Sequence, residues 1–129
     1  MRTKMGNTKL TVDGEIFDSK REYRRWCELK ILERAGEISD LRRQVVYELI
    51  PRQTEKYARY GKNGQRLKDG ERVLELPVRY IADFQYVQDG KTIVEDVKGY
   101  RNTNSAVYAK FVIKRKLMLW LKGIIVKEV

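Results

Sequence analysis

The fold is decided by residues 80–99, whose sequence is YIADFQYVQDGKTIVEDVKG. Apolar residues fill two runs, and the Asp-Gly pair between them supplies the positive φ angles that a tight hairpin turn needs. The stretch therefore predicts two antiparallel strands, one ending at Tyr86 and the next covering residues 92–98. Each strand carries a carboxylate among apolar neighbours, Asp83 on the first and Asp96 on the second.

The two carboxylates and a nearby lysine suggest a chemistry. Asp96 and Lys98 are two residues apart on one strand, so their side chains point to the same face. Glu95 and Val97 point to the opposite face. Two carboxylates from neighbouring strands, beside an ammonium group, suit metal-assisted hydrolysis of a phosphodiester. The alternative is a solvated hairpin face with an ion pair, although an acid such as Asp83 in an apolar strand usually needs a partner.

The segment before this hairpin predicts a capped helix. Residues 11–17 hold a short turn, and a helix follows from Ser19, its N-cap, to about Ala35. Ser19 and Glu22 have the spacing of a capping box. Gly36 follows as a plausible helix stop.

The other elements follow from turn residues and hydrophobic periodicity. They are a strand over residues 41–50 ending at Pro51, a loop or irregular hairpin extension over 52–71, strand material over 73–86 broken at Pro77, a loop over 99–103, a helix from residue 104 or 105 to Leu121, and a closing strand over 124–129 after Gly123. This order predicts a single α/β domain over residues 11–129, preceded by a flexible basic arm over residues 1–10.

The composition narrows the chemistry and the partner. The chain has 28 Lys and Arg against 18 Asp and Glu, a formal net charge of +10, which favours a polyanionic partner. It has no histidine, which excludes Ser-His-Asp triads and His-ligated zinc. Its one cysteine, Cys27, cannot form an intramolecular disulfide. We expect no signal peptide, no membrane span and a cytoplasmic protein.

The positive charge gathers toward the C-terminus. Seven basic residues and one acid fall within residues 101–129, so their side chains contribute +6 of the +10. Arg101, Lys110 and Lys114 are candidates for phosphate contacts, with Lys110 and Lys114 four apart on one helix face. The alternative is a solvated surface that keeps the protein soluble.

Three stretches together resemble the PD-(D/E)XK nuclease superfamily. They are FDSKRE at residues 17–22, YIADF at residues 80–84 and EDVKG at residues 95–99. In particular, they resemble a family of small, mostly phage-borne proteins of that superfamily that is described as a domain of unknown function. The resemblance covers about residues 11–129. One departure is that Ala82 stands where the superfamily's motif has a proline, which weakens the literal motif more than the assignment.

The resemblance implies a fold and a reaction. The fold is restriction-endonuclease-like, with a central mixed β-sheet flanked by α-helices. Glu22, Asp83, Asp96 and Lys98 would be the catalytic residues, and the three carboxylates would bind Mg²⁺, with Mn²⁺ as a substitute. The reaction would be hydrolysis of a DNA phosphodiester that leaves a 5′-phosphate. The sequence has no P-loop and no G-x-G-x-x-G motif, so we expect no nucleotide cofactor.

The expected substrate follows from the small size of the chain. One small domain leaves little surface for reading bases, so recognition of DNA shape through the backbone is expected. The chain resembles the small dimeric Holliday-junction resolvases, which implies a homodimer that cuts branched DNA in phage recombination, in the cytoplasm of a bacterial host. The alternatives are a transposase-type or restriction-type nuclease subunit acting with a partner, and a catalytically silent DNA-binding protein.

Several side chains have a second interpretation. Glu22 fits the capping box, although it shares a helix face with Trp26, which should point inward. Gln44 could reach the site and contact DNA, or could be an ordinary polar strand residue. Tyr23, Trp26 and Trp120 are expected in the core, with stacking platforms for bases as the alternative.

Overall fold

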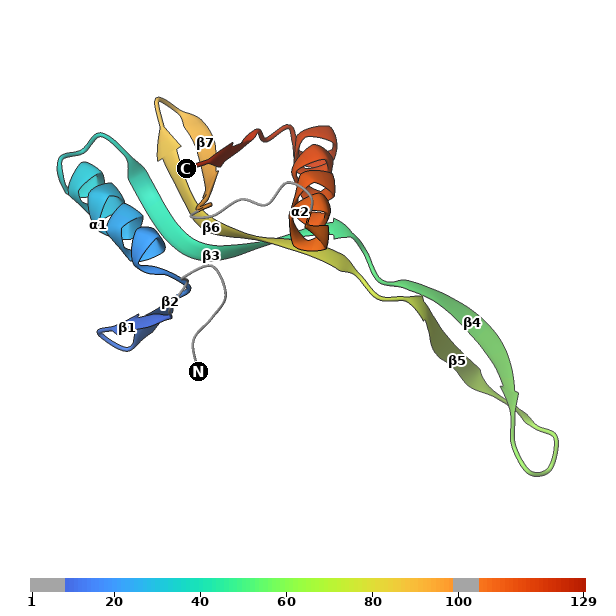
Figure 1. Ribbon diagram of the computed structural model, residues 1–129. Coiled ribbons are helices and arrows are strands. Elements are labelled where there is room, and N and C mark those ends of the chain that lie inside the picture. Colours follow the sequence, from blue (N-terminus) through green and yellow to red (C-terminus); the bar gives the residue numbers. More distant parts are fainter. Residues whose placement is uncertain (1–8, 99–104) are drawn as a thin grey trace.

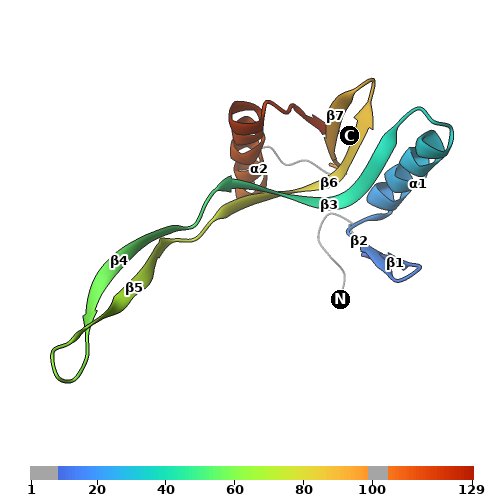
Figure 2. The same ribbon diagram turned by 180° about the vertical axis from the view of Figure 1, so that it is seen from behind.

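The computed structural model describes residues 9–98 and 105–129. A two-stranded ribbon projects from a mixed α/β body, and both the front and the rear view show it leaving one end of the body (Figures 1 and 2). In chain order the elements are β1 (Leu10–Val12), β2 (Glu15–Phe17), α1 (Lys20–Arg34), β3 (Ser39–Ile50), β4 (Gln53–Tyr60), β5 (Arg66–Glu75), β6 (Val78–Gln88), β7 (Lys91–Asp96), α2 (Ala106–Leu117), the π-helical turn η2 (Met118–Lys122) and β8 (Val126–Glu128).

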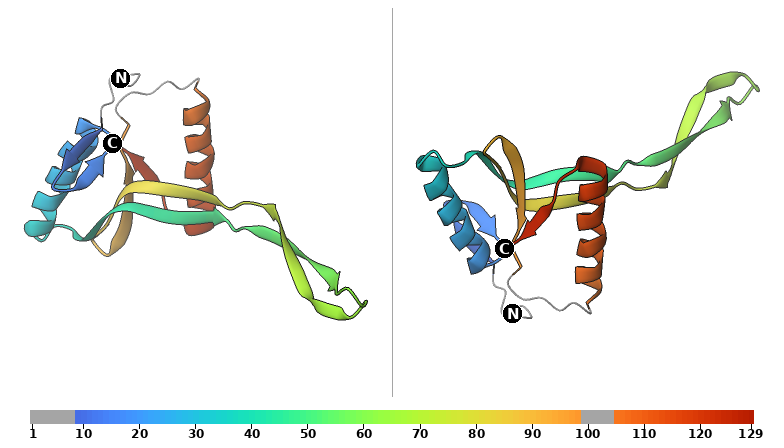
Figure 3. Two further views of the ribbon diagram at one scale, coloured as in Figure 1. Left: turned by 90° about the horizontal axis from the view of Figure 1, so that it is seen from below. Right: turned by 90° about the horizontal axis from the view of Figure 1, so that it is seen from above.

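The central sheet has the strand order β3-β6-β7-β8. β6 is antiparallel to both β3 and β7, whereas β8 is parallel to β7. The parallel connection passes through α2, because two parallel strands need a crossover rather than a tight turn. α1 and α2 lie on opposite sides of the β6–β7 hairpin (Figures 1 and 3). The predicted mixed sheet with two helices is therefore confirmed.

The tight turn between β6 and β7 is confirmed. Asp89 and Gly90 have φ angles of 52° and 75°, and the flanking Gln88 and Lys91 are paired. A two-residue turn with two positive φ angles matches the twist of the strands and fixes their register. In that register Phe84 pairs with Glu95. The next positions along the two strands are Asp83 and Asp96, so the turn brings the two predicted carboxylates together.

The cap of α1 is confirmed in part. Ser19 Oγ accepts a hydrogen bond from the Glu22 N–H at 3.1 Å, as an N-cap should. The reciprocal bond of the capping box is different, because Glu22 Oε2 accepts from the Asp18 N–H at 2.8 Å rather than from Ser19. At the other end Gly36 has a φ of 80°, which explains why the helix stops there.

The core has two parts that meet at β6. One packs α2 and β8 against the sheet, with Leu49, Tyr80, Ala82, Val94, Phe111, Met118 and Val126 buried. The other packs α1, with Leu29, Ile38, Phe84 and Tyr86 buried and Trp26 partly buried against them. Asp83 lies between Ala82 of the first part and Phe84 of the second. The predicted active-site carboxylate therefore sits where both parts hold its strand.

The ribbon (residues 53–75) settles two alternatives left by the sequence. Regular antiparallel pairing runs from Gln53 with Glu75 to Tyr60 with Arg66. The hairpin extension was therefore the right interpretation of residues 52–71, and the loop was wrong. Hydrophobic alternation marks a strand only where one of its faces is buried, and every residue of β4 is exposed. The predicted break at Pro77 is confirmed, since β5 ends at Glu75 and β6 begins at Val78.

The C-terminal helix ends where predicted, but its last turn differs. The helix continues as a π-helical turn from Met118 to Lys122, and Gly123 closes it with a φ of 68°. The core prediction for Trp120 was wrong, because this side chain on the π-helical turn is 84% exposed while Met118 fills the core. Within the described ranges, no helix combines the length and apolar character needed to cross a membrane. The predicted loop over 99–103 and most of the predicted arm over 1–10 lie outside the described residues.

Candidate active site

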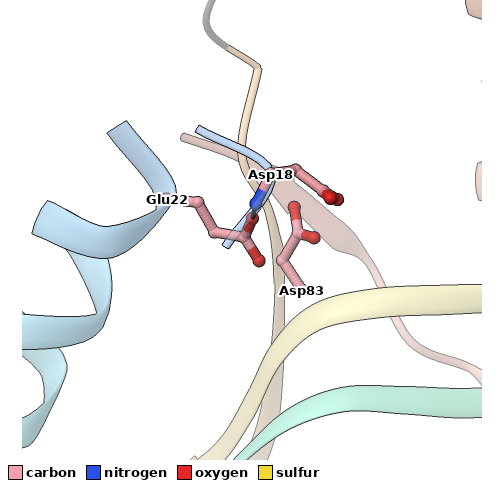
Figure 4. A group of neighbouring side chains, drawn as sticks. All are labelled: Asp18, Glu22 and Asp83. Carbon is pink, nitrogen blue, oxygen red and sulfur yellow. Dashed lines mark hydrogen bonds between the residues drawn. The ribbon is translucent and has the colours of Figure 1, made fainter. Parts of the chain in front are cut away.

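Three carboxylates from different parts of the chain converge at the N-terminal end of α1. Asp18 precedes the helix, Glu22 lies in its first turn, and Asp83 lies on β6. One oxygen of each lies within 4.8 Å of the other two, and the close-up shows Glu22 and Asp83 approaching from opposite sides (Figure 4). Oxygen ligands gathered in this way are the donor set that hard divalent cations prefer.

Asp83 is held in place by the neighbouring strand. Its Oδ2 accepts a hydrogen bond from the Val97 N–H at 2.7 Å, which ties it to the end of β7. Burial, followed by the negative charges of Asp96 and Glu22, raises the pKa of Asp83 to about 8, although the Val97 bond acts in the opposite direction. Without a neutralising cation, the site holds more negative charge than this surrounding stabilises.

Glu22 is fixed almost completely inside the protein. Its side chain is 2% exposed, and its two oxygens accept hydrogen bonds from different elements: Oε2 from the Asp18 N–H and Oε1 from Gln44 Nε2 at 3.0 Å. Burial is the largest effect on its pKa, which lies above the ordinary value. Arg43 on β3 partly offsets the charge at 3.7 Å. Glu22 therefore combines a local role at the helix start with a place in the carboxylate cluster.

Asp96 and Lys98 form the other half of the site. Asp96 is 6% exposed, and its Oδ2 lies 2.5 Å from Lys98 Nζ. The ammonium group also lies 3.8 Å from the centre of the Phe111 ring on α2, so the helix holds the lysine from a second side. Tyr80 lies nearby, and its pKa is raised by burial and then by the charges of Asp96 and Asp83. The ion pair predicted from the two-residue spacing is present, next to the cluster.

Gln44 occupies an unusual backbone position beside the cluster. Its φ is 52°, which is uncommon for a residue other than glycine, and it lies between the pairs that join Arg43 to Phe84 and Val45 to Ala82. In that register Gln44 faces the position of Asp83. Strained backbone of this kind costs on the order of 1–3 kcal/mol and gathers at functional sites. The conformation lets the side chain reach Glu22.

Glu95 belongs to a separate buried ion pair. Its two oxygens accept from Arg25 Nε at 2.8 Å and from Arg25 Nη2 at 2.7 Å, and one also accepts from the Tyr86 hydroxyl. Burial acts to raise the pKa of Glu95, but the hydrogen bonds from Arg25 and Tyr86 outweigh it and hold the pKa below its usual range. The strand alternation placed Glu95 away from Asp96, and its contacts with α1 agree with that placement.

A basic hollow lies next to the end of β7. Its volume is about 390 Å³, and it is lined by Arg21, Arg24, Arg25, Glu28, Val97 and Val129. Arg25 is engaged by Glu95 and Glu28, but Arg21 and Arg24 form no ion pair with any residue in the described ranges. Val97 lies directly between Asp96 and Lys98, so these two free guanidinium groups are neighbours of the site.

The sequence was compared with known families and proteins. Residues 2–127 match the model of a family described as "Protein of unknown function (DUF1064)". The chain belongs to this family. No curated protein and no solved structure matches it.

The site of this DUF1064 protein contains the four residues that the sequence singled out as catalytic. Glu22, Asp83, Asp96 and Lys98 lie together, linked by the contacts described above. The residue that the sequence analysis missed is Asp18, the third member of the close carboxylate group. A signal was available, since Asp18 lies four residues before Glu22 and directly before the N-cap, where the chain turns into the helix.

The predicted DNA-binding residues lie in different places. On α2, Lys110 is exposed and Lys114 is partly buried, one turn to either side of the buried Phe111 that contacts Lys98. Gln44 lies inside the carboxylate cluster, bonded to Glu22. Arg101 lies outside the described residues. The DNA contacts of these residues stay predictions.

Proposed function

We propose that this DUF1064 protein is a metal-dependent DNA endonuclease with a PD-(D/E)XK-type site on a restriction-endonuclease-like fold. The observation that carries the proposal is the convergence of Asp18, Glu22 and Asp83, with oxygens within 4.8 Å, beside the Asp96–Lys98 pair. These residues come from separate elements, so their meeting is a property of the fold rather than of local sequence. The resemblance of the same residues to the superfamily motif supports the proposal independently.

The donor set fits Mg²⁺ or Mn²⁺. Opposite ligands of an octahedral Mg²⁺ ion are about 4.2 Å apart, because each metal–oxygen bond is about 2.1 Å. The carboxylate oxygens of Asp18, Glu22 and Asp83 already lie within 4.8 Å of one another, so only a small inward movement would be needed. A divalent cation held there would polarise a phosphate and lower the pKa of a bound water. Asp96, next to Asp83, is the remaining carboxylate available to it.

The protein groups around this position have complementary tasks. The Lys98 ammonium can stabilise negative charge that grows on the phosphate oxygens or orient the attacking water, and Asp96 and Phe111 hold it in place. Gln44 and the Asp18 N–H orient the carboxylate of Glu22. The free guanidinium groups of Arg21 and Arg24 can bind a neighbouring phosphate of the same strand.

The proposed substrate is branched duplex DNA. The net charge of +10 favours a polyanion, and the basic side chains near the site suit contacts with the backbone. A protein that reads the backbone distinguishes shapes better than base sequences. A homodimer would supply two such sites related by twofold symmetry, which suits paired cuts across a junction.

A cleavage panel tests the proposal. The substrates are a linear duplex, a single strand, a flap and a four-way junction, each with Mg²⁺, Mn²⁺, Ca²⁺ or EDTA. We expect cutting with Mg²⁺ and Mn²⁺, preference for the junction, and little turnover with Ca²⁺ because its looser coordination positions water poorly. Lys98→Ala should abolish turnover while a divalent cation still binds. Cutting in EDTA would refute the metal assignment, and a preference that follows base sequence rather than branching would refute the resolvase assignment.

A further inference from the structure

The ribbon carries a concentrated positive charge that the proposed active site does not use. Between Pro51 and Pro77 the chain has seven basic and four acidic residues, a net charge of +3. The outer part is more extreme, because residues 56–68 contain five basic residues and no acid. The residues of β4, and most of those of β5, are exposed. The ribbon therefore has no core function that would explain its composition.

Ion pairs within the ribbon leave a defined set of free cations. Three arginines are neutralised: Arg52 by Glu71, Arg66 by Asp69 and Arg72 by Glu55. The remaining basic side chains, which form no ion pair with any residue of the described ranges, are Lys56, Arg59, Lys62 and Lys68. Lys56 and Lys68 line one hollow of about 330 Å³ on the ribbon. These four cations are available to a partner.

The ribbon also has contacts that hold its shape. The ring of Tyr57 covers Gly70 on the opposite strand so closely that a Cβ there would lie 2.3 Å from the ring. The guanidinium group of Arg72 lies over the same ring at 4.8 Å and bonds to Glu55. A two-stranded ribbon without such cross-strand contacts is only marginally stable. The free cations are thus presented on a shaped element.

We infer that the ribbon binds the phosphate backbone of a duplex segment that flanks the cleavage site, an inference that rests on the proposed function. At about 3.3 Å per residue, the path from Lys68 to Asp83 along β5 and β6 is up to roughly 50 Å, or about 15 base pairs at 3.4 Å each. The ribbon projects away from the body in every view (Figures 1–3). It would therefore contact DNA well beyond the scissile phosphate, on one arm of a branched substrate.

The charge favours DNA over a second copy of the chain as the occupant. Two identical ribbons would bring their free cations together, and like charges repel at short range. A duplex offers one negative charge for every ~1.7 Å of its axis, so it can engage Lys56 and Lys68 at once. The exposed rings of Tyr57 and Tyr60, both contacted by arginines, are compatible with a nucleic-acid surface.

Duplex length and ribbon charge can be varied together to test this inference. The binding protein is the full chain with Asp83→Asn, which should not cut. It is compared with the same chain carrying Lys56→Gln and Lys68→Gln, and with a matched control carrying Arg34→Gln and Lys91→Gln, two exposed and unpaired cations on the body. Each protein is titrated with linear duplexes of about 10 and about 40 base pairs, of which only the longer reaches the ribbon at 3.4 Å per base pair.

The parent and the control should gain affinity on the long duplex, and the ribbon variant should lose most of that gain. Each lost phosphate contact should lower the salt slope by about one and the affinity at 0.1 M salt by roughly eightfold. An unchanged gain would overturn the inference, and so would a loss of dimer in sedimentation without a change in DNA affinity. Thermal melting checks the fold, and Arg59→Gln with Lys62→Gln replaces the pair if it is unstable.

Failure of the inference differs from failure of the proposed function. Wild-type chain and Mg²⁺ are assayed in parallel for cleavage of the same duplexes. If cleavage occurs and the length gain ignores the ribbon, the ribbon inference is overturned and the nuclease stands. If no DNA structure is cut but the length gain depends on the ribbon, the nuclease proposal fails and the ribbon remains a DNA-binding element.

Discussion

The carboxylate cluster and the ribbon belong to one long hairpin, made of β3 with β4 and β5 with β6. Its inner half is covered by helices and carries the buried acids Asp83 and, through Gln44, a contact to Glu22. Its outer half is uncovered and carries free cations such as Lys56 and Lys68. Along one pair of strands, the protein thus passes from buried negative charge to exposed positive charge.

This difference shows what each kind of charge requires. Buried carboxylates need many fixed partners, because an uncompensated charge in the interior is costly. Glu22 alone is contacted from Asp18, Gln44 and Arg43. Exposed lysines need only water until a partner arrives. The cluster therefore suits chemistry that depends on geometry, and the ribbon suits binding that depends on charge.

The sharpest way to break the comparison is to remove a charge from the cluster. Asp83→Asn and Asp96→Asn should each reduce the cleavage rate by at least ~100-fold, because each removes a charged metal ligand or its neighbour. DNA affinity should be retained. Lys62→Gln on the ribbon is the control and should leave the maximal rate unchanged. Quantitative cleavage at saturating DNA gives the answer, and a fully active Asp83→Asn protein would remove Asp83 from the site.

A second expected effect concerns stability and pH. The pKa of Asp83 is about 8 in the folded protein, against 3.8 ordinarily, so the unfolded chain releases this proton at lower pH. Between pH 4 and 8 the folded state binds more protons, and stability in EDTA should fall as the pH rises through that window. Ca²⁺ at 100 times its Kd should restore about 2.7 kcal/mol, or a Tm increase of about 10 °C.

Thermal melts of the wild type and of Asp83→Asn at pH 5 and 8 measure this effect. The asparagine variant should show a smaller loss of Tm between the two pH values and little response to Ca²⁺. The ribbon pair Lys56→Gln with Lys68→Gln is the control, because its side chains are exposed and should not change the response. An equal response in all three proteins would show that the cluster is not a cation site.

Glu22 allows the local and the catalytic role to be separated. Glu22→Gln keeps an acceptor for the helix start but loses the charge, so cleavage should fall by about 10-fold to 100-fold with little change in Tm. Ser19→Ala is the matched control. It should cost about 1 kcal/mol of stability through the lost N-cap and leave the rate nearly intact. Full activity of Glu22→Gln would make its role purely structural.

The smallest expected effect belongs to the ribbon. Lys56→Gln with Lys68→Gln should raise the KM for a long duplex by about tenfold and leave kcat within about twofold, because the lost contacts bind substrate and transition state equally. Steady-state cleavage at several DNA concentrations separates the two constants. A fall in kcat with an unchanged KM would place the ribbon in the chemistry and blur the distinction between the two regions.

Much of the body could be predicted because its signals are local. The Asp89-Gly90 turn fixes the register of β6 and β7, and the register brings Asp83 and Asp96 together. Ser19 and Gly36 mark the ends of α1. These residues act through backbone geometry within a few positions, so a single sequence contains the information.

The remaining features depend on distant contacts or on the absence of burial. Asp18 joins the cluster only because α1 docks beside β6, which no spacing within residues 17–22 reveals. The regular pairing of the ribbon left no hydrophobic alternation, since it has no buried face. Trp120 looked like a core residue by type, but the π-helical turn directs Met118 inward instead. Each case was decided by tertiary packing rather than by propensity.

The boundary of the ribbon has a consequence for engineering. Both prolines of the chain, Pro51 and Pro77, stand at this boundary, and the pair Ile50 and Val78 closes the sheet just inside it. The two ends of the ribbon therefore leave the body side by side. A two-residue Asn-Gly turn joining Ile50 to Val78 matches the gap between paired strands. The ribbon is thus a removable module, and ribbons of other lengths or charges can be exchanged at this position to alter the footprint on DNA.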